Sequence, residues 1–453
     1  MQSARPNVVI ILADDMGPLT IAPTSPLSLP HLHGLYQDSR VFANARSPAF
    51  LCAPGRYALM TGNLPLRSRT GFGQWAWPAP SALKPDQRSI AQLLREGGGY
   101  HTQFAGKWHL GGDPIETGFD GALFVPRGHS FTPYTTLVRG KGIKRPDECS
   151  EQEDNTSWRA ALPNCLAAHA RNVLLSAPTP FFYYHSASQM HGPYSPGAGL
   201  HQLGMVANES GYGPRFDAVV SFDLSVGAIL RALDTRGVAA STFVVLMSDH
   251  GQDCDWEHVL AKVATCPQAQ ATGQEKSFNF FKGMRGYKGK PFEGGLRVPL
   301  WVRWPGIIQP GVSTATTATI DYVRTLLHMI RVDVPHLQAI DSANLSDEWL
   351  ANSPPAQSLR NVFVANGSPA VAIRIGDHKA IFRRQYRACP WNTTAPFYAH
   401  CFNSLGLYDL SRDPLEITNL LYSSAIEMRC MRDGLLRIIN SASPPTVLPL
   451  CTR

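Results

Sequence analysis

Residues 51–62 combine a cysteine, a proline and an arginine at a spacing that suits chemistry on an anion. Pro54 fits the first turn of a helix, because its missing N–H would have had no partner there. Cys52 would then lie at the helix N-terminus, where the helix dipole favours negative charge. Arg56, one turn further on, would add a second positive group. The segment predicts an oxidisable side chain facing an anion site, although a single cysteine is more often a small buried apolar residue.

Several uninterrupted apolar runs are followed by polar residues that can do chemistry: Asp14 and Asp15 follow residues 7–13, Asp249 and His250 follow 242–248, Lys107 and His109 follow 100–106, and His191 follows 180–185. Such runs are typical of parallel strands that are covered on both faces. Ligands of parallel sheets bind beyond the carboxyl ends of the strands. We therefore expect these polar residues to meet in one crevice, although they are far apart in the chain.

Segments with helical periodicity lie between these apolar runs, and the predicted helices would hold the predicted strands in place. Residues 89–96 form an apolar-periodic segment that stops at the glycines 97–99, and residues 219–236 form another that stops at Gly237. Glycine just past the last periodic residue is a typical helix stop. Alternation of strands and helices predicts an α/β fold with a largely parallel sheet.

The pattern changes after about residue 353, where short strand-like segments are joined by turns. Residues 361–365, 370–375 and 379–382 are predicted strands, and residues 423–440 a final helix. This predicts a catalytic domain at residues 1–355 and a smaller domain with an antiparallel sheet at residues 356–453.

The composition argues against nucleic-acid binding and against a membrane-spanning helix. The chain has 453 residues and a formal net charge of +7, but its Lys and Arg residues are scattered rather than gathered in a basic block. Nucleic-acid binding is therefore not expected. No apolar run approaches the length that a transmembrane helix requires.

Cysteines and glycosylation sequons favour an oxidising compartment. Apart from Cys52, the cysteines are Cys149, Cys165, Cys254, Cys266, Cys389, Cys401, Cys430 and Cys451. An even remainder with close neighbours suggests disulfides between neighbours, and the absence of a Cys-x-x-Cys pair argues against a zinc cluster. Asn-x-Ser/Thr sequons occur at Asn155, Asn208, Asn344, Asn366 and Asn392. Together these features predict the secretory pathway, with the protein extracellular or lysosomal, or periplasmic if it is bacterial.

Six motifs occur in order along nearly the whole chain. The first three are the Asp pair after the first apolar run, Cys-x-Pro-x-Arg with Thr-Gly at 52–62, and Gly-Lys-Trp-His-Leu-Gly at 106–111. The other three are Ser-Asp-His-Gly at 248–251, Lys-Gly-Lys-Pro-Phe-Glu-Gly-Gly-Leu-Arg-Val-Pro at 288–299, and Leu-Tyr-Asp-Leu at 407–410, which is followed by Asp-Pro, Glu416 and Asn-Leu. With these motifs the chain resembles the type I, formylglycine-dependent sulfatases of the alkaline phosphatase superfamily, near the arylsulfatase A and N-acetylgalactosamine sulfatase branch. The resemblance implies a large mixed, mostly parallel sheet sandwiched by helices and a smaller C-terminal α+β domain.

The resemblance also implies two cofactors. Cys52 would be converted to formylglycine by a formylglycine-generating enzyme; one hydroxyl of the aldehyde hydrate would attack sulfur, and the other would later expel sulfate. A single Ca²⁺ would be bound by Asp14, Asp15, residue 52, Asp249 and His250. Carboxylate-rich sites suit Ca²⁺, whereas the His250 imidazole is a softer partner. Gly55 departs from the serine that is most common in the modification box.

Residue by residue, the resemblance implies a catalytic set of Cys52, Arg56, Lys107, His109, His191 and Lys288. Arg56 would hold the hydrate, and Lys107 and Lys288 would contact sulfate oxygens. His109 would take the proton that triggers sulfate release. His191, with Lys288, would face and protonate the leaving group, so that Lys107, His191 and Lys288 are also the substrate-binding residues. Glu293 and Glu416 are expected to be architectural.

The predicted activity is that of an arylsulfatase-like sulfuric ester hydrolase acting on a small-molecule or glycan sulfate ester. A catalytically silent relative that binds sulfated glycans, and a phosphoester hydrolase of the same superfamily, are the alternatives. Phosphoester hydrolases of this fold use a Thr or Ser nucleophile and usually two metals, which the Cys52 motif argues against. Loops 72–77 and 141–145 and His129 are possible parts of the substrate rim.

Overall fold

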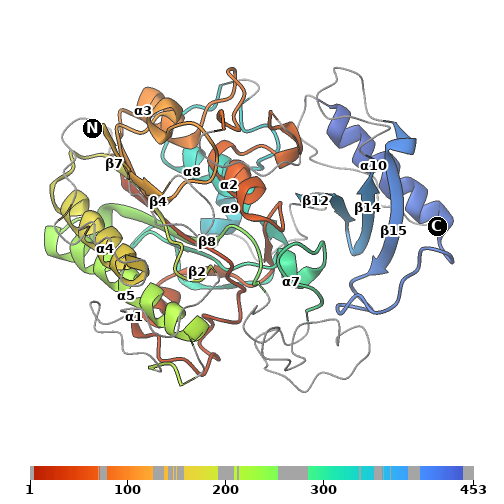
Figure 1. Cartoon of the computed structure of the whole chain (residues 1–453), viewed down its shortest axis with the longest axis horizontal. Helices are drawn as coiled ribbons and strands as arrows, with labels where there is room; N and C mark the ends of the chain where they lie inside the picture. Colours follow the sequence, from red (N-terminus) through yellow and green to blue (C-terminus); the bar gives the residue numbers. More distant parts are fainter. Residues whose placement is uncertain are drawn as a thin grey trace.

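The main body of the protein is a mixed nine-stranded sheet in the order β10-β2-β9-β8-β1-β7-β4-β5-β6 (Figure 1). The computed structural model describes residues 5–69, 71, 79–125, 137–140, 146, 149, 158–191, 209–211, 214–253, 284–335, 338–350, 360, 362–367, 369–385 and 398–441. The sheet strands are Asn7–Ala13 (β1), Arg40–Phe42 (β2), His101–Lys107 (β4), Gly121–Val125 (β5), Leu137–Gly140 (β6), Phe181–Ser186 (β7), Thr242–Ser248 (β8), Leu300–Arg303 (β9) and Gly311–Ser313 (β10).

The central strands β8, β1, β7, β4 and β5 run parallel to one another. Antiparallel pairings join β9 to β8 and β6 to β5 at the flanks. All residues of β1, β7 and β8 are buried, which explains their uninterrupted apolar sequences. Ala13 pairs with Ser248, and Leu12 with Ser186, so these strands end side by side. The fold class predicted from the sequence is confirmed.

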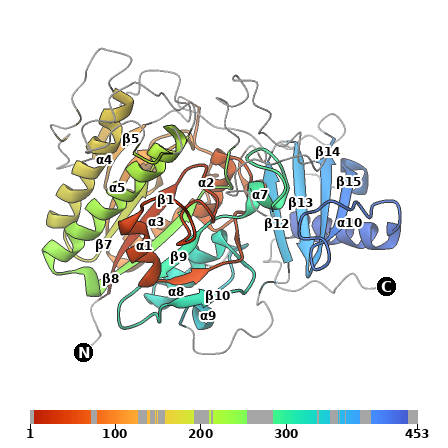
Figure 2. The same ribbon diagram turned by 90° about the horizontal axis from the view of Figure 1, so that it is seen from below.

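Helices cover both faces of this sheet, as the views in Figures 1 and 2 show. One face carries α1 (Pro30–Gln37), α4 (Trp158–Ser176) and α5 (Pro214–Arg236), and the other carries α2 (Cys52–Thr61), α3 (Ile90–Gly98), α8 (Tyr322–Met329) and α9 (Ser346–Leu350). Alternate residues of β1 pack into the two hydrophobic cores, one on each face of the sheet. Val9 and Ile11 belong to one core, and Ile10 and Leu12 belong to the other. This division follows from the period of two along a strand.

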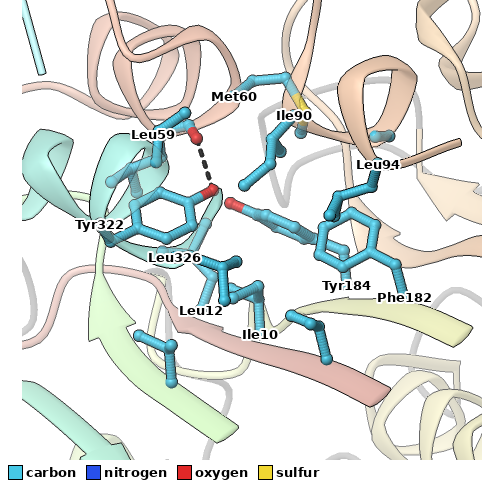
Figure 3. Packing of buried hydrophobic residues seen from close by; sticks show 14 of the residues in the cluster. Ile10, Leu12, Leu59, Met60, Ile90, Leu94, Phe182, Tyr184, Tyr322 and Leu326 are labelled. Atoms are coloured by element: carbon cyan, nitrogen blue, oxygen red, sulfur yellow. Dashed lines mark hydrogen bonds between the residues drawn. The ribbon is translucent and has the colours of Figure 1, made fainter. Parts of the chain in front are cut away.

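The core between the sheet and α2 fixes the helix that begins with Cys52. Leu59 and Met60 pack among Ile10, Leu12 and Tyr184 in one buried cluster (Figure 3). The hydroxyl of Tyr322, in α8, donates a hydrogen bond of 2.6 Å to the Leu59 carbonyl oxygen. Because α2 is buried along its whole length, its N-terminus is held in place near the carboxyl ends of the central strands.

A second sheet of four antiparallel strands lies beyond α7 (Glu293–Leu296), as Figure 2 shows. Its strands are β12 (Val362–Gly367), β13 (Ala370–Ile375), β14 (His378–Arg384) and β15 (Phe402–Asp409), in that order, and α10 (Ala425–Asn440) packs against them. The remaining elements are the small β3–β11 pair (Ala45–Arg46 and Thr317–Ala318) and short 3-10 turns at Pro65–Arg67, Pro114–Thr117, Ala239–Ser241, Thr319–Asp321 and Ala399–Cys401. The antiparallel C-terminal sheet is confirmed, while the division at residues 355 and 356 stays a prediction.

The cysteines and sequons are accounted for in part. Cys149 and Cys165 form a disulfide, as expected for close neighbours. Cys401 and Cys430 each take part in a disulfide as well. Cys52 is the free cysteine of the described residues. Of the sequon asparagines that the structure describes, Asn366 is fully buried in β12 and Asn344 is exposed. Cys254, Cys266, Cys389, Cys451, Asn155, Asn208 and Asn392 lie outside the described residues.

None of the helices in the described part of the chain combines the length and the apolar character that a membrane span needs.

Candidate active site

The predicted site residues meet where β1, β8, β7 and β4 end. Asp14 and Asp15 directly follow β1, and Asp249 and His250 directly follow β8. Lys107 is the last residue of β4. The sequence placed these side chains at the carboxyl ends of parallel strands, and the pairing of those strands brings the ends together.

Cys52 enters the same crevice from α2. The preceding Leu51 is extended, with φ −144° and ψ 152°, and Pro54 occupies the first turn, so the helix begins at Cys52 as the sequence predicted. The helix ends at Gly62, whose left-handed backbone closes it. The Cys52 side chain is buried, and its Sγ lies 3.1 Å from Nε2 of His250.

Arg56 is the centre of an ion-pair network beneath Cys52. Its Nε lies 3.0 Å from Oδ2 of Asp249, and its Nη2 lies 3.3 Å from Oδ2 of Asp14. Its Nη1 donates to the Lys107 carbonyl oxygen and to the Ser186 hydroxyl. A planar guanidinium can serve all these acceptors at once, which an ammonium cannot. Arg56 is 3% exposed, so these contacts are shielded from solvent.

Each of the two lysines holds one aspartate. Nζ of Lys107 lies 2.6 Å from Oδ2 of Asp14, and Nζ of Lys288 lies 2.8 Å from Oδ2 of Asp15. Nζ of Lys288 also lies 3.0 Å from Nε2 of His191. The lysines therefore place two ammonium groups beside Asp14 and Asp15, where an anionic group would meet them.

One group of side chains is arranged so that it can hold a metal ion. Ligand atoms of Asp14, Asp15, Cys52 and His250 all lie within 4.8 Å of one another, and all four residues are buried. Nδ1 of His250 lies 2.8 Å from the Gly251 carbonyl oxygen, which directs Nε2 toward the group. The Oδ1 atom of Asp14 is buried and has no hydrogen-bond partner among the described residues.

Asp249 stands beside this group rather than in it. Its Oδ1 accepts hydrogen bonds from the backbone N–H groups of Asp15 and His250, and its Oδ2 pairs with Arg56. Burial and the nearby Asp14 charge raise the pKa of Asp249 to about 7. Such concentrated negative charge is what a bound divalent cation would neutralise, so the acidic residues fit Ca²⁺. The His250 nitrogen is the one donor of the group that this hard cation does not prefer.

Electrostatics favour the charged forms of Cys52 and Asp15. Burial alone would raise the pKa of the Cys52 thiol, but Lys107, Lys288 and His250 hold it well below its usual value. Burial would likewise raise the pKa of Asp15, which Lys288 and His191 hold well below its usual range. Perturbed pKa values of this kind cluster at functional sites.

His109 and His191 flank Cys52 with different protonation behaviour. Burial lowers the pKa of His109 to about 4, against a weaker opposing contribution from its hydrogen bond with Cys52. Burial and Lys107 lower the pKa of His191, but Asp15, Cys52 and Asp14 outweigh them and raise it overall. His109 is therefore a neutral base at neutral pH, while His191 is the better proton donor.

Backbone strain is concentrated at the same place. Asp15 and His109 are non-glycine residues with positive φ angles of 59° and 56°. Residues in this region persist only where the surrounding structure holds them, and they are frequent at active sites. Here the strain turns a carboxylate and an imidazole toward Cys52 from the ends of β1 and β4.

Two residues of the site were not identified from the sequence. The Ser186 hydroxyl contacts both Arg56 and the Lys107 carbonyl oxygen. Oδ2 of Asp253 lies 3.5 Å from Nζ of Lys288. Asp253 follows the Ser-Asp-His-Gly turn closely, so proximity to that motif was the signal that could have found it. The predicted rim positions 72–77, 141–145 and His129 lie outside the described residues.

Comparisons with known proteins agree with this geometry. The family model described as Sulfatase matches residues 6–332. Human arylsulfatase A is 29% identical over 92% of this chain and 83% of its own length. Human N-acetylgalactosamine-6-sulfatase is 29% identical over 93% of this chain and 82% of its own length.

Solved structures share the fold over nearly the whole chain. A Bacteroides thetaiotaomicron 6S-sulfatase structure, reported with that bacterium's metabolism of multiple glycosaminoglycans, has a TM-score of 0.77 at 22% identity and covers 97% of this chain and 100% of its own. A second structure, with a TM-score of 0.62 at 17% identity, covers 96% of this chain and 97% of its own and holds its substrate D-glucosamine-2-N,6-O-disulfate. Structural neighbours thus include proteins that bind sulfated sugars. Because the family model covers most of the chain and the curated relatives match nearly its whole length, the chain belongs to the sulfatase family, a family of sulfuric ester hydrolases.

Proposed function

We propose that this protein hydrolyses a sulfate ester to an alcohol and inorganic sulfate, using a formylglycine made from Cys52 and one calcium ion. The observation that carries the proposal is the position of Cys52. It begins a buried helix, lies within 4.8 Å of ligand atoms on Asp14, Asp15 and His250, and is surrounded by the positive charges of Lys107 and Lys288.

Asp14, Asp15 and His250, with residue 52, would hold the calcium ion, and Asp249, which lies beside them, would complete the set. The bound cation would supply positive charge that stabilises a sulfate oxygen and lowers the pKa of a hydroxyl at residue 52. The Oδ1 atom of Asp14, which is buried and has no hydrogen-bond partner in the described part of the chain, supports this assignment, as does the raised pKa of Asp249.

Formylglycine at position 52 would supply a hydrated aldehyde whose hydroxyl is the nucleophile toward sulfur. Arg56 would orient that group, because it is locked by Asp14, Asp249 and the Lys107 carbonyl oxygen. The location at a helix N-terminus adds the dipole of α2 to the same anion site.

Lys107 and Lys288 would bind the sulfate oxygens. Lys107 is buried and Lys288 is partly buried, and each is already paired with a carboxylate, so both are positioned before the substrate arrives. Preorganised cations that face developing negative charge stabilise the transition state without the reorganisation that water would need.

Two histidines would move the protons. His191, 3.0 Å from Nζ of Lys288, would protonate the departing alcohol oxygen together with that lysine. His109, which hydrogen-bonds Cys52 and whose pKa is lowered to about 4, is neutral at neutral pH and would accept the proton that accompanies sulfate release. The two sides of the reaction thus have separate acid and base groups.

The remaining proposals concern the substrate, the maturation partner and the location of the protein. We propose a glycan or small-molecule sulfate ester as substrate, a formylglycine-generating enzyme as the maturation partner, and a secretory-pathway, lysosomal or periplasmic location. The disulfide between Cys149 and Cys165 supports an oxidising compartment, and the sulfated sugar bound by a structural neighbour supports the substrate class.

The deciding experiment is a mass spectrum of the tryptic peptide 47–56 from protein made in its native host, together with hydrolysis of an aryl sulfate. We expect an aldehyde at residue 52, hydrolysis by the wild type, and at least a thousandfold loss in Cys52→Ala, because the nucleophile is removed. A thiol in all of the material, even after co-expression with a formylglycine-generating enzyme, would favour a silent glycan-binding protein. Full hydrolysis by Cys52→Ala would overturn the mechanism.

A further inference from the structure

Lys288 lies on a turn that is anchored on both sides by one residue of the C-terminal region. The residues on either side of this turn are Arg285 and Glu293. Nη1 of Arg285 donates to the backbone carbonyl oxygen of Glu416. The backbone N–H of Glu293 donates to Oε2 of Glu416 at 2.8 Å. Glu416 is fully buried and has a positive φ of 55°, so it is held in a conformation that non-glycine residues rarely adopt.

Lys379 of β14 completes this arrangement from the C-terminal sheet. Its Nζ lies 2.8 Å from Oε1 of Glu416 and 3.1 Å from Oε1 of Glu293. Nη2 of Arg46, in β3, lies 2.7 Å from the other oxygen of Glu293. Burial would raise the pKa of Glu293, but Arg46 and Lys379 hold it far below its usual value, so the carboxylate is charged. We call Arg285, Glu293, Lys379 and Glu416 the clasp.

The turn between the two anchors is buried at Gly286 and Glu293, near its two ends, and its exposed middle is held to the rest of the chain by backbone hydrogen bonds. The backbone N–H of Lys288 donates to the Gln252 carbonyl oxygen at 2.8 Å, and that of Gly289 donates to the Phe50 carbonyl oxygen at 2.7 Å. A Cβ atom added at Gly295 would lie 2.2 Å from the Lys290 carbonyl oxygen. Interiors packed this closely transmit shifts instead of absorbing them.

Removing a buried partner leaves the other charges uncompensated and forces local rearrangement. In the clasp that rearrangement would fall on both ends of the Lys288 turn, since Glu416 binds both. Nζ of Lys288 meets Asp15 and His191 at 2.8 and 3.0 Å, and positioning errors near 1 Å are enough to cost a reaction about a hundredfold.

We propose that Glu416 and Lys379 are positioning residues that set the place of Lys288 in the active site, so that the C-terminal sheet contributes to sulfate binding through the clasp. The proposal rests on the proposed role of Lys288 in sulfate hydrolysis. It differs from an architectural role, in which the clasp would stabilise the fold without any specific effect through Lys288.

The test is a double-mutant cycle on the full chain, with Glu416→Gln made in the wild-type and in the Lys288→Ala backgrounds. Glu416→Gln keeps the size of the side chain and removes its charge. Two quantities are measured in each protein: kcat/KM on an aryl sulfate, and the Kd of inorganic sulfate by calorimetry. Arg285→Leu, in the same two backgrounds, is a second variant that breaks the clasp without exposing a buried charge and keeps apolar contact with Phe292.

The matched control is Asp341→Asn, which removes a buried carboxylate from an ion pair with Arg67 that does not touch the Lys288 turn. We expect Glu416→Gln and Arg285→Leu to lower kcat/KM and sulfate affinity about tenfold or more in the wild-type background, and less than twofold further in Lys288→Ala. We expect Asp341→Asn to lower the melting temperature but to change kcat/KM by the same small factor in both backgrounds.

Equal losses in both backgrounds would overturn the proposal, because the clasp would then act independently of Lys288. Wild-type activity and sulfate affinity in both clasp variants would overturn it as well. If Glu416→Gln does not fold, the Arg285→Leu cycle decides. If the wild type hydrolyses no sulfate ester, the proposed function fails, and the cycle of sulfate Kd values still decides whether the clasp acts through Lys288.

Discussion

Only one of the two oxygens of the Asp14 carboxylate is paired with Lys107. Nζ of Lys107 lies 2.6 Å from Oδ2, whereas Oδ1 is buried and has no hydrogen-bond partner among the described residues. Buried polar atoms without a partner are rare and costly, and they often mark a bound ion. The lysine therefore leaves one oxygen of this carboxylate directed to the group formed by Asp15, Cys52 and His250.

Calcium binding should stabilise the folded protein through Asp14. Adding Ca²⁺ to chelator-treated protein at a hundred times its Kd should contribute about 2.7 kcal/mol to the free energy of unfolding, because only the folded state presents the site. The melting temperature should rise by a few degrees in the wild type and not in Asp14→Asn. Asp234→Asn, on the exposed face of α5, should respond as the wild type does. A wild-type melting temperature unaffected by Ca²⁺ and by EGTA would remove the calcium assignment.

Arg56→Lys should abolish most of the activity. A lysine keeps the charge but cannot reach Asp14, Asp249 and the Lys107 carbonyl oxygen at once. We expect kcat/KM on a sulfate ester to fall about a hundredfold or more, the usual loss when a preorganised electrostatic contact is removed from an active site.

Arg236→Lys is the matched control for that variant. Arg236 donates to the carbonyl oxygens of Leu174 and Ala177 and lies over the ring of Phe181, at the start of β7, whereas the site lies at the other end of that strand. We expect a lower melting temperature with kcat/KM within about threefold of the wild type. Similar kinetic losses in the two variants would show that Arg56 has only a structural role.

Gly55→Ser should destabilise this protein although serine is the residue most common at that place in the modification box. A Cβ atom at Gly55 would lie 2.3 Å from the backbone carbonyl oxygen of Asp249, so α2 or the end of β8 would have to move. We expect a loss of about 1–3 kcal/mol in the free energy of unfolding by urea denaturation. Gly34→Ser, in a helix where an added Cβ meets nothing within 4 Å, should be neutral or stabilising. A wild-type stability for Gly55→Ser would show that the close approach is not rigid.

Two buried histidines away from the active site should make stability depend on pH. His169, in α4, stacks on Tyr183, and the ring of His185, in β7, lies tilted against the same tyrosine at 6.2 Å between centroids. The ring nitrogens of both histidines have no hydrogen-bond partner among the described residues. Burial lowers the pKa of each to about 4, whereas the ordinary value is 6.5. The unfolded chain therefore binds more protons between pH 6.5 and about pH 4, and stability is lost as the pH falls through that window.

The free energy of unfolding should be lower at pH 5 than at pH 7.5 by about 2 kcal/mol for each of these histidines. The double variant His169→Met, His185→Met replaces both rings with apolar side chains of similar volume. Urea titrations at the two pH values should show a smaller difference in the double variant than in the wild type. An unchanged difference would mean that other groups dominate the acid sensitivity.

Much of the fold and of the site was predictable because the signals are local. Strands β1, β7 and β8 are buried on both faces, so their sequences are uninterrupted apolar runs that end at Asp15, Ser186 and Asp249. The box around Cys52 carries its own helix start in Pro54 and its own stop in Gly62. Residue types that are costly to bury, such as the adjacent Asp14 and Asp15, mark a site without any knowledge of their partners.

Other features were not predictable from the sequence, because the residue types involved are common and their surroundings come from contacts between distant parts of the chain. Ser186 is one serine among many until β4 and α2 bring the Lys107 carbonyl oxygen and Arg56 to its hydroxyl. Asn366 carries a sequon that the strand pairing of β12 buries.

The sequence by itself determined which residue types are available to the site: a cysteine at a helix start, and paired carboxylates and basic groups at strand ends, in an α/β chain. The tertiary structure alone decided which carboxylate each cation meets, with Lys107 on Asp14 and Lys288 on Asp15, and placed Glu416 against both anchors of the Lys288 turn. The physical reason is that hydrogen bonds and ion pairs depend on distances of a few tenths of an ångström. Such distances between residues far apart in the chain are set by packing, which no local pattern encodes.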